Sequence, residues 1–127
     1  MQGILLVGLG GFLGSIARYK LSGWILHMIT QGRFPFGTFT VNVLGCLVVG
    51  VLAGLAERYD MFSSDARLLL FTGLLGGFTT FSAFGLETVY LIRRGDMGTA
   101  ALYAGGSVVL GVMAVWLGLK LVTMFPR

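Results

Sequence analysis

The hydrophobic pattern along this chain consists of long uncharged stretches separated by short clusters of charge. Three stretches carry no charged side chain: residues 34–56, 68–86 and 97–119. A fourth, residues 2–17, is followed by Arg18 and Lys20 before apolar residues resume. A membrane-spanning helix needs about 20 mostly apolar residues. The pattern therefore predicts one four-helix transmembrane domain over residues 1–127, with spans at residues 3–29, 35–57, 66–93 and 97–124.

The composition agrees with this prediction and excludes other classes. The chain has 127 residues, of which 56% are hydrophobic and 11% charged, against about 25% charged in a typical soluble domain. Such a surface fits neither an ordinary soluble enzyme nor a disordered chain. The single cysteine, Cys46, excludes an internal disulfide framework. The net charge of +4 is spread thinly, so we expect no nucleic-acid partner.

The positive charges show no clear preference for one side of the membrane. With four spans, both termini share a side with the second connector. That side carries Arg58, Arg67, Lys120 and Arg127, and the other carries Arg33, Arg93 and Arg94, with Arg18 and Lys20 if these are counted. Most membrane proteins show a clear bias. Either the orientation is weakly specified, or the chain inserts both ways and forms an antiparallel, dual-topology homodimer.

Glycine is strongly over-represented, with 21 residues. Three pairs have the small-xxx-small spacing that lets helices approach closely in lipid: Gly10 and Gly14, Gly50 and Gly54, and Gly73 and Gly77. Residues 8–14 superficially suggest a dinucleotide-binding turn. The required third glycine falls on Leu13, and no βαβ pattern follows, so we reject that interpretation.

The middle of the third span contains features that weaken a helix. Gly76 and Gly77 are followed closely by Thr79 and Thr80. One interpretation is a continuous helix whose hydroxyls bond back to the preceding turn. The other is a helix interrupted near the bilayer midplane, with freed carbonyls that line an ion site.

Further polar and aromatic side chains in the spans are candidate site residues: Arg18, Thr38, Asn42, Phe81, Phe84, Glu87, Tyr103 and Ser107. The Asn42 amide is able to donate to a neighbouring helix or to an anion. Glu87 either faces the same lumen as Phe84 or extends to the interface near Arg93. Arg18 either extends to the interface, attracts an anion or forms a structural pair. No nucleophile–base pair or phosphate loop is evident, so we expect a transport protein and not an enzyme.

Three segments, together with Glu87, carry a resemblance to a known family. They are GGFLGSIARY at 10–19, PFGTFTVNVLG at 35–45 and GLLGGFTTFSAF at 73–84. With these motifs in this order and spacing, the chain resembles the Fluc (CrcB-type) fluoride channels over essentially its whole length. The resemblance implies an antiparallel dual-topology homodimer with two fluoride pores. It also implies a sodium ion at the dimer centre and a place in a prokaryotic cytoplasmic (inner) membrane.

The resemblance also implies roles for particular residues. The fluoride pathway would comprise Phe81, Phe84, Asn42, Thr38, Thr80, Ser82, Tyr103, Ser107 and Glu87. Backbone carbonyls of Gly76 and Thr79 would hold the sodium ion, and Arg18 would lie near a vestibule. One departure is Gly111, where some relatives carry a hydroxyl. This difference puts the last step of the polar pathway in question, or leaves that step to water.

Two other functions remain as alternatives at this point. A small dual-topology, proton-coupled multidrug exporter shares the four spans and balanced charges, but is expected to place a carboxylate deep in a span. Glu87 is the one acidic residue in the predicted spans before their ends, and it lies late in the third. A non-transporting subunit of a larger assembly would need only the glycine pairs.

The charge balance yields a first prediction. Tags at the termini should be accessible from both sides of the membrane, because neither orientation is favoured by positive charge. Accessibility labelling in sealed vesicles measures this directly, and a single orientation in all vesicles would contradict it.

Overall fold

The computed structural model describes residues 1–30 and 32–126, so Gln31 and Arg127, the latter counted above among the positive charges, lie outside it. Over the described residues the secondary structure is helical, without strands. Four of the described segments are long and apolar enough to cross a membrane: Gln2–Met28, Phe36–Tyr59, Ser64–Arg93 and Met97–Thr123. The ends of these helices differ from those of the predicted spans by no more than two residues.

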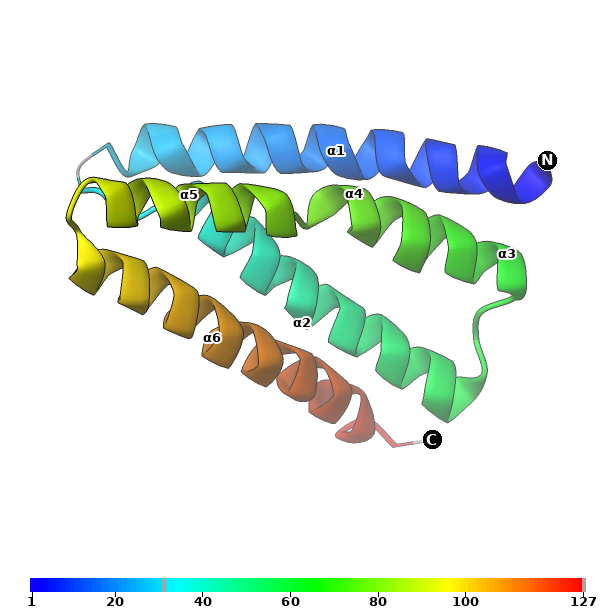
Figure 1. Cartoon of the computed structure of the whole chain (residues 1–127). Helices are drawn as coiled ribbons and strands as arrows, with labels where there is room; N and C mark the ends of the chain where they lie inside the picture. The colour runs from blue at the N-terminus through cyan, green and yellow to red at the C-terminus, as the bar shows by residue number, and fades with distance from the viewer. Residues whose placement is uncertain (31, 127) are drawn as a thin grey trace.

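Three of the four spans are single helices. The remaining span, which is the third in chain order, consists of several shorter helical segments. The single helices are α1 (Gln2–Met28), α2 (Phe36–Tyr59) and α6 (Met97–Thr123). The third span comprises α3 (Ser64–Arg67), the π-helical segment η1 (Leu68–Leu75), α4 (Gly76–Phe78) and α5 (Phe81–Arg93). Figure 1 shows α4 and α5 end to end, with a short non-helical connection between them. No feature of the sequence predicted the π-helical segment, a geometry often found at functional sites.

Side chains fix where two of the helical segments begin. The Ser63 hydroxyl accepts a hydrogen bond from the backbone N–H of Ala66 at 3.1 Å, so Ser63 caps the start of the third span. The Asp96 carboxylate accepts from the N–H of Thr99 at the start of α6. The N-terminus and the C-terminal end of α6 lie at the same end of the molecule as the connector between α2 and α3 (Figure 1), as four spans require.

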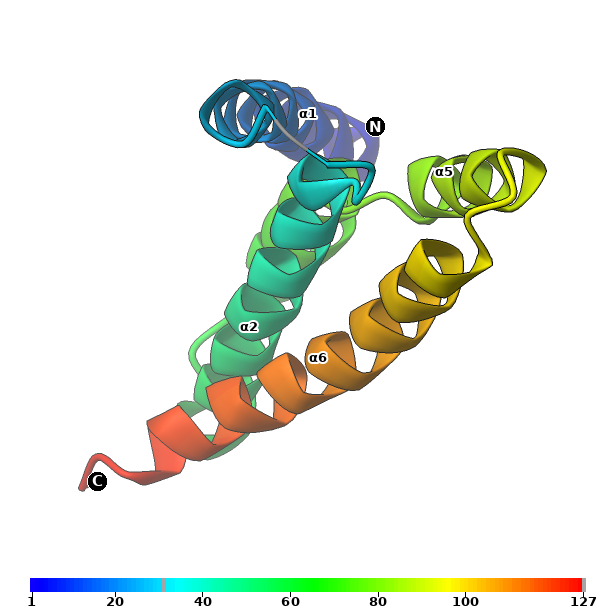
Figure 2. The ribbon, with the colours of Figure 1, turned by 90° about the vertical axis from the view of Figure 1, so that its left-hand side faces the viewer.

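The helices pair in an alternating order along the chain. The first span packs on the third, with α1 against η1 and α4, and the second packs on the fourth, with α2 against α6. Figure 2 shows α2 and α6 close together near the C-terminus and diverging towards α5. Helix α5 packs against α6. The break in the third span thus joins a part that belongs with α1 to a part that belongs with α6.

Glycine backbones form the contact between α1 and the third span. A Cβ atom at Gly10 would lie 2.7 Å from the amide nitrogen of Leu74, and one at Gly14 would overlap the Leu74 carbonyl. From the opposite side, a Cβ at Gly77 would lie 2.6 Å from the carbonyl oxygen of Gly11. This backbone approach is what the small-xxx-small spacing predicts. The role of two predicted glycine pairs in helix packing is confirmed.

The contact between α2 and α6 follows the same principle. A Cβ at Gly50 would overlap the carbonyl oxygen of Val115, and one at Gly54 would lie 3.0 Å from a methyl of Val122. On the facing helix, a Cβ at Gly118 would meet the backbone of Leu47 and Val51. The third predicted pair is confirmed, and Gly118 is a partner that the spacing did not identify.

Much apolar surface remains outside these contacts. Phe12, Trp116 and Val112 are 63%, 60% and 66% exposed. Among the described residues, Thr38 and Tyr103 are buried side chains that carry a hydroxyl group. An apolar exterior over a sparse interior is the arrangement expected of helices surrounded by lipid or by partner helices.

The glycine contacts yield a second prediction. Gly14→Ala should lower the free energy of unfolding by about 1–3 kcal/mol, because the added methyl must push α1 away from the Leu74 carbonyl. Gly23→Ala on the same helix is the matched control, since its Cβ meets nothing within 4 Å. Thermal unfolding of the purified protein in detergent measures both. Equal melting temperatures for the two variants would contradict the packing role of Gly14.

Candidate functional site

The centre of the site is the interruption of the third span. Helix α4 ends at Phe78 and α5 begins at Phe81. Thr79 (φ −92°, ψ 157°) and Thr80 (φ −150°, ψ 113°) are extended. The third span is therefore interrupted, and the continuous helix is wrong; the place of the interruption near the bilayer midplane and its ion site stay predictions. The interruption falls on the threonines, while Gly76 and Gly77 remain helical and Gly77 serves the contact with α1.

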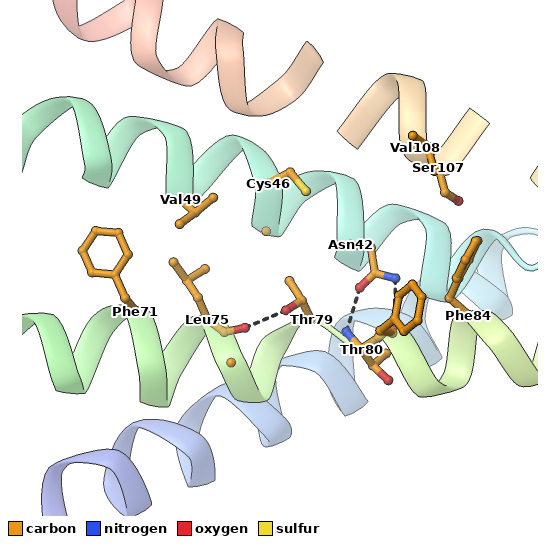
Figure 3. A pocket seen from close by; sticks show the side chains of 13 residues that line it. Asn42, Cys46, Val49, Phe71, Leu75, Thr79, Thr80, Phe84, Ser107 and Val108 are labelled. Atoms are coloured by element: carbon orange, nitrogen blue, oxygen red, sulfur yellow. Dashed lines mark hydrogen bonds between the residues drawn. The ribbon is translucent and has the colours of Figure 1, made fainter. Parts of the chain in front are cut away.

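The Asn42 side chain holds the extended segment in place. Its Nδ2 donates to the carbonyl of Thr80 at 3.0 Å, and its Oδ1 accepts from the N–H of the same residue at 2.8 Å. Figure 3 shows both bonds reaching from α2 to the break. The amide thus replaces the partners that the backbone lost when the helix ended. Of the two destinations considered for this amide, the neighbouring segment is confirmed, and a second N–H of Nδ2 remains for another acceptor.

Threonine hydroxyls satisfy the two helix ends that meet at the break. The Thr79 hydroxyl donates to the Leu75 carbonyl at 2.9 Å, in the last turn of the preceding helix. The Thr80 hydroxyl accepts from the N–H of Ala83 at 3.2 Å and lies 3.3 Å from the Ser82 hydroxyl. Thr80 is therefore the N-cap of α5. The positive end of the α5 dipole points at the break, a location that favours an anion.

Arg18 reaches the break from α1. Its Nε donates to the Gly77 carbonyl at 3.0 Å, one residue from Gly76 and two from Thr79. Of the roles considered for Arg18, the structure shows a pairing with backbone. Its expected position near a vestibule stays a prediction.

Glu87 joins α2 and α6 through two hydroxyl groups. The Thr38 hydroxyl donates to its Oε1 at 2.7 Å, and the Tyr103 hydroxyl donates to its Oε2 at 2.9 Å. Tyr103 is fully buried. Glu87 therefore faces the interior with Phe84, and the alternative in which it extends towards Arg93 is wrong.

Aromatic rings connect the break to this hydroxyl–carboxylate cluster. The centroids of Phe81 and Phe84 lie 5.6 Å apart, and those of Phe84 and Tyr103 lie 5.1 Å apart. The Phe34 ring meets the Tyr103 ring edge-on at 5.4 Å. Phe34 lies just outside a predicted span, and nothing in the sequence separates it from other connector residues. Phe81, by contrast, is 83% exposed.

An open groove of about 450 Å³ runs along the break. Its lining residues are Asn42, Gly45, Cys46, Val49, Phe71, Leu75, Gly76, Thr79, Thr80, Phe81, Phe84, Ser107 and Val108. Figure 3 shows α2 on one side of the groove and the interrupted span on the other. The Ser107 hydroxyl oxygen is buried and has no hydrogen-bond partner among the described residues. Ser107 is therefore a lining residue of the groove whose hydroxyl is unsatisfied in this structure.

The residues next to the groove account for the other predicted positions. Thr38, Glu87 and Tyr103 form the cluster beside Phe84, and Ser82 lies against the Thr80 hydroxyl. A Cβ atom at Gly111 would lie 3.4 Å from the Cys46 sulfur. A side chain at this position would therefore lie next to the Cys46 thiol. The structure thus brings the predicted residues into one continuous region, with Arg18 attached through Gly77.

Gly76 and Thr79 both line the groove, which suits the predicted cation site. The nearest atom to a Cβ at Gly76 would be the Phe71 carbonyl oxygen at 3.8 Å, so the space beside this residue is open. Carbonyl oxygens released at a helix end are suitable ligands for a hard monovalent cation. Among the described residues there is no cluster of three or more His, Cys, Asp or Glu side chains that would hold a metal.

The sequence of this chain is similar to known proteins along most of its length. The profile of the family described as "CrcB-like protein, Camphor Resistance (CrcB)" matches residues 5–119. A protein from Methylobacillus flagellatus named "Fluoride-specific ion channel FluC" is 56% identical over 98% of this chain and 97% of its own length. The chain belongs to the CrcB family.

Other proteins with the same name are similar to this chain along most of its length. One from Nitratidesulfovibrio vulgaris is 49% identical over 94% of this chain and 95% of its own. One from Acidobacterium capsulatum is 45% identical over 91% of each chain. The expected resemblance is therefore confirmed, and the comparisons do not favour a multidrug exporter.

The two hydrogen bonds between the Asn42 side chain and the Thr80 backbone yield a third prediction. Asn42→Ala should raise the hydrogen-exchange rate of the Thr80 amide by about tenfold or more, because the variant removes the acceptor of that amide. Val48→Ala, on the exposed face of α2, is the control. Hydrogen–deuterium exchange with mass spectrometry on peptides that contain residues 79–83 measures the effect. Unchanged exchange in Asn42→Ala would show that the extended segment does not depend on this amide.

Proposed function

We propose that this chain is a passive, fluoride-selective channel that exports fluoride across the cytoplasmic membrane of a prokaryote. The observation that carries the proposal is the groove at the helix break, where amide and hydroxyl donors lie beside two phenylalanine rings. Membership of a family whose similar members are named fluoride-specific ion channels supports the choice of ion. The region contains the parts of a pathway: donors, aromatic rings and an open groove.

The donors are suited to a small, strongly hydrated anion. A pore must replace the water that such an ion loses, and neutral N–H and O–H groups supply replacements without trapping it. The free N–H of Asn42 and the unpartnered hydroxyl of Ser107 both border the groove. Beyond Phe84, the hydroxyls of Thr38 and Tyr103 continue the polar surface towards the other end of the bundle.

Phe81 and Phe84 would guide the anion between these donors. The edge of an aromatic ring carries the positive part of its quadrupole, so an edge-on ring attracts an anion without a full charge. Weak attraction of this kind favours rapid release, which conduction requires. The two rings are tilted by 39° to each other.

The proposal includes an antiparallel dual-topology homodimer with two pores and a central sodium ion. A second copy would cover the open groove and the exposed Phe81 ring. Carbonyls of Gly76 and Thr79 would hold the sodium ion, whose charge would raise the local potential for anions. In this arrangement the two breaks would cross near the bilayer midplane, and Arg18 would border a vestibule.

Ion flux tests the proposal directly. Liposomes containing the purified protein should release fluoride at a rate far above protein-free liposomes and should release scarcely any chloride. A fluoride electrode and a chloride electrode in parallel measure the two fluxes. Similar fluoride and chloride fluxes would reject the proposed selectivity.

The two phenylalanines provide the matching variants. Phe81→Ile and Phe84→Ile should each reduce the fluoride flux by about tenfold or more, because they keep apolar bulk but remove the ring edge. Phe12→Ile, on the exposed face of α1, is the control and should conduct like the unaltered protein. Full flux in both groove variants would show that the rings only pack.

A further inference from the structure

The Gly77 carbonyl is an acceptor that the break deprives of its usual donor. In an unbroken helix it would accept from the backbone N–H of Phe81, four residues later. Helix α5 begins anew at Phe81, so that N–H belongs to the first turn of another helix. The Nε–H of Arg18 donates to the Gly77 carbonyl instead, at 3.0 Å.

The glycine contact brings Arg18 within reach of this carbonyl. Gly11 and Gly14 let α1 touch the backbone of η1 and α4. Arg18 lies one helical turn beyond Gly14, on the same face of α1. Its side chain therefore extends past the last turn of α4, where the freed carbonyl lies.

The hydrogen bond between Arg18 and the Gly77 carbonyl is expected to be strong. A carbonyl without a partner in a low-dielectric region is costly, and a charged donor forms a strong bond with it. A positive group at the C-terminal end of a helix is also favourable for the helix dipole. Asn42 holds Thr80 from α2 while Arg18 holds Gly77 from α1. The break is therefore held from two opposite helices.

We propose that Arg18 is a positioning residue, whose Nε–H fixes the Gly77 carbonyl towards α1 while Gly76 and Thr79 line the groove. Fluoride conduction then depends on this hydrogen bond, beyond any attraction of the anion by the positive charge. The inference rests on the proposed function only for the flux measurement. A second, structural measurement at the break is independent of the transported ion.

Three substitutions separate the bond from the charge. Arg18→Gln places an amide nitrogen the same number of bonds from Cα as the arginine Nε, so it keeps the donor and removes the charge. Arg18→Lys keeps the charge but has a methylene at that place. Arg18→Met has neither. Lys20→Gln, at an exposed position on the same helix, is the control for loss of a positive charge.

Two measurements are made on the full chain: fluoride efflux from liposomes, and hydrogen exchange of peptides that contain residues 79–83. Arg18→Gln should stay within about threefold of the unaltered protein in both, whereas Arg18→Lys and Arg18→Met should each change by about tenfold or more. The Lys20→Gln variant should match the unaltered protein.

The proposal requires that Arg18→Gln retains more fluoride flux and more protection from hydrogen exchange than Arg18→Lys and Arg18→Met. Any other ranking of the three variants overturns it. Retention by Arg18→Lys with loss in Arg18→Gln would assign the role to charge alone. If the unaltered protein releases no fluoride, the proposed function fails, and the exchange measurement still decides the role of Arg18.

Discussion

The structure depends on how a helix can be interrupted inside an apolar bundle without leaving its backbone polar groups unsatisfied. Lipid offers no hydrogen bonds, so each freed N–H and C=O needs a partner from the protein or from what fills the groove. The Asn42 amide supplies a donor and an acceptor to one residue, Thr80. This pair of bonds gives the extended segment a fixed place against α2. The groove, the ring positions and the start of α5 all follow from that place.

The same break divides the third span between two partners. Its first part is held by glycine contacts with α1, and its second part packs on α6 beside Tyr103. Because these partners are far apart in the sequence, the break is where the two helix pairs are joined. The hydroxyl–carboxylate cluster at Glu87 gives a second connection between α2, α5 and α6. Polar groups, together with close approaches at Gly37 and Gly45, thus connect the pairs, while other glycines form the contacts within each pair.

The sequence predicted the spans well because hydropathy and length act locally. It also predicted the glycine pairs, since their spacing is a property of one helix. It left the destinations of Asn42 and Glu87 open, because these depend on which helices become neighbours. The π-helical segment at 68–75 and the ring contact of Phe34 with Tyr103 had no local signal. The glycines at 76 and 77 suggested the region of the break but not its position, which is set by the Asn42 amide two turns into the neighbouring span.

The alternating pairing of the helices has a consequence for assembly during synthesis. The partner of α2 is α6, the last helix to emerge, and the partner of α1 lies in the third span. The larger contact of each early helix therefore forms only after a later span has entered the bilayer, although α1 and α2 also touch each other. A glycine face carries no polar side chain, and its backbone is already bonded within the helix, so lipid tolerates it during that delay. The glycine faces that pack the finished bundle thus expose no unsatisfied polar group to lipid before their partner helices arrive.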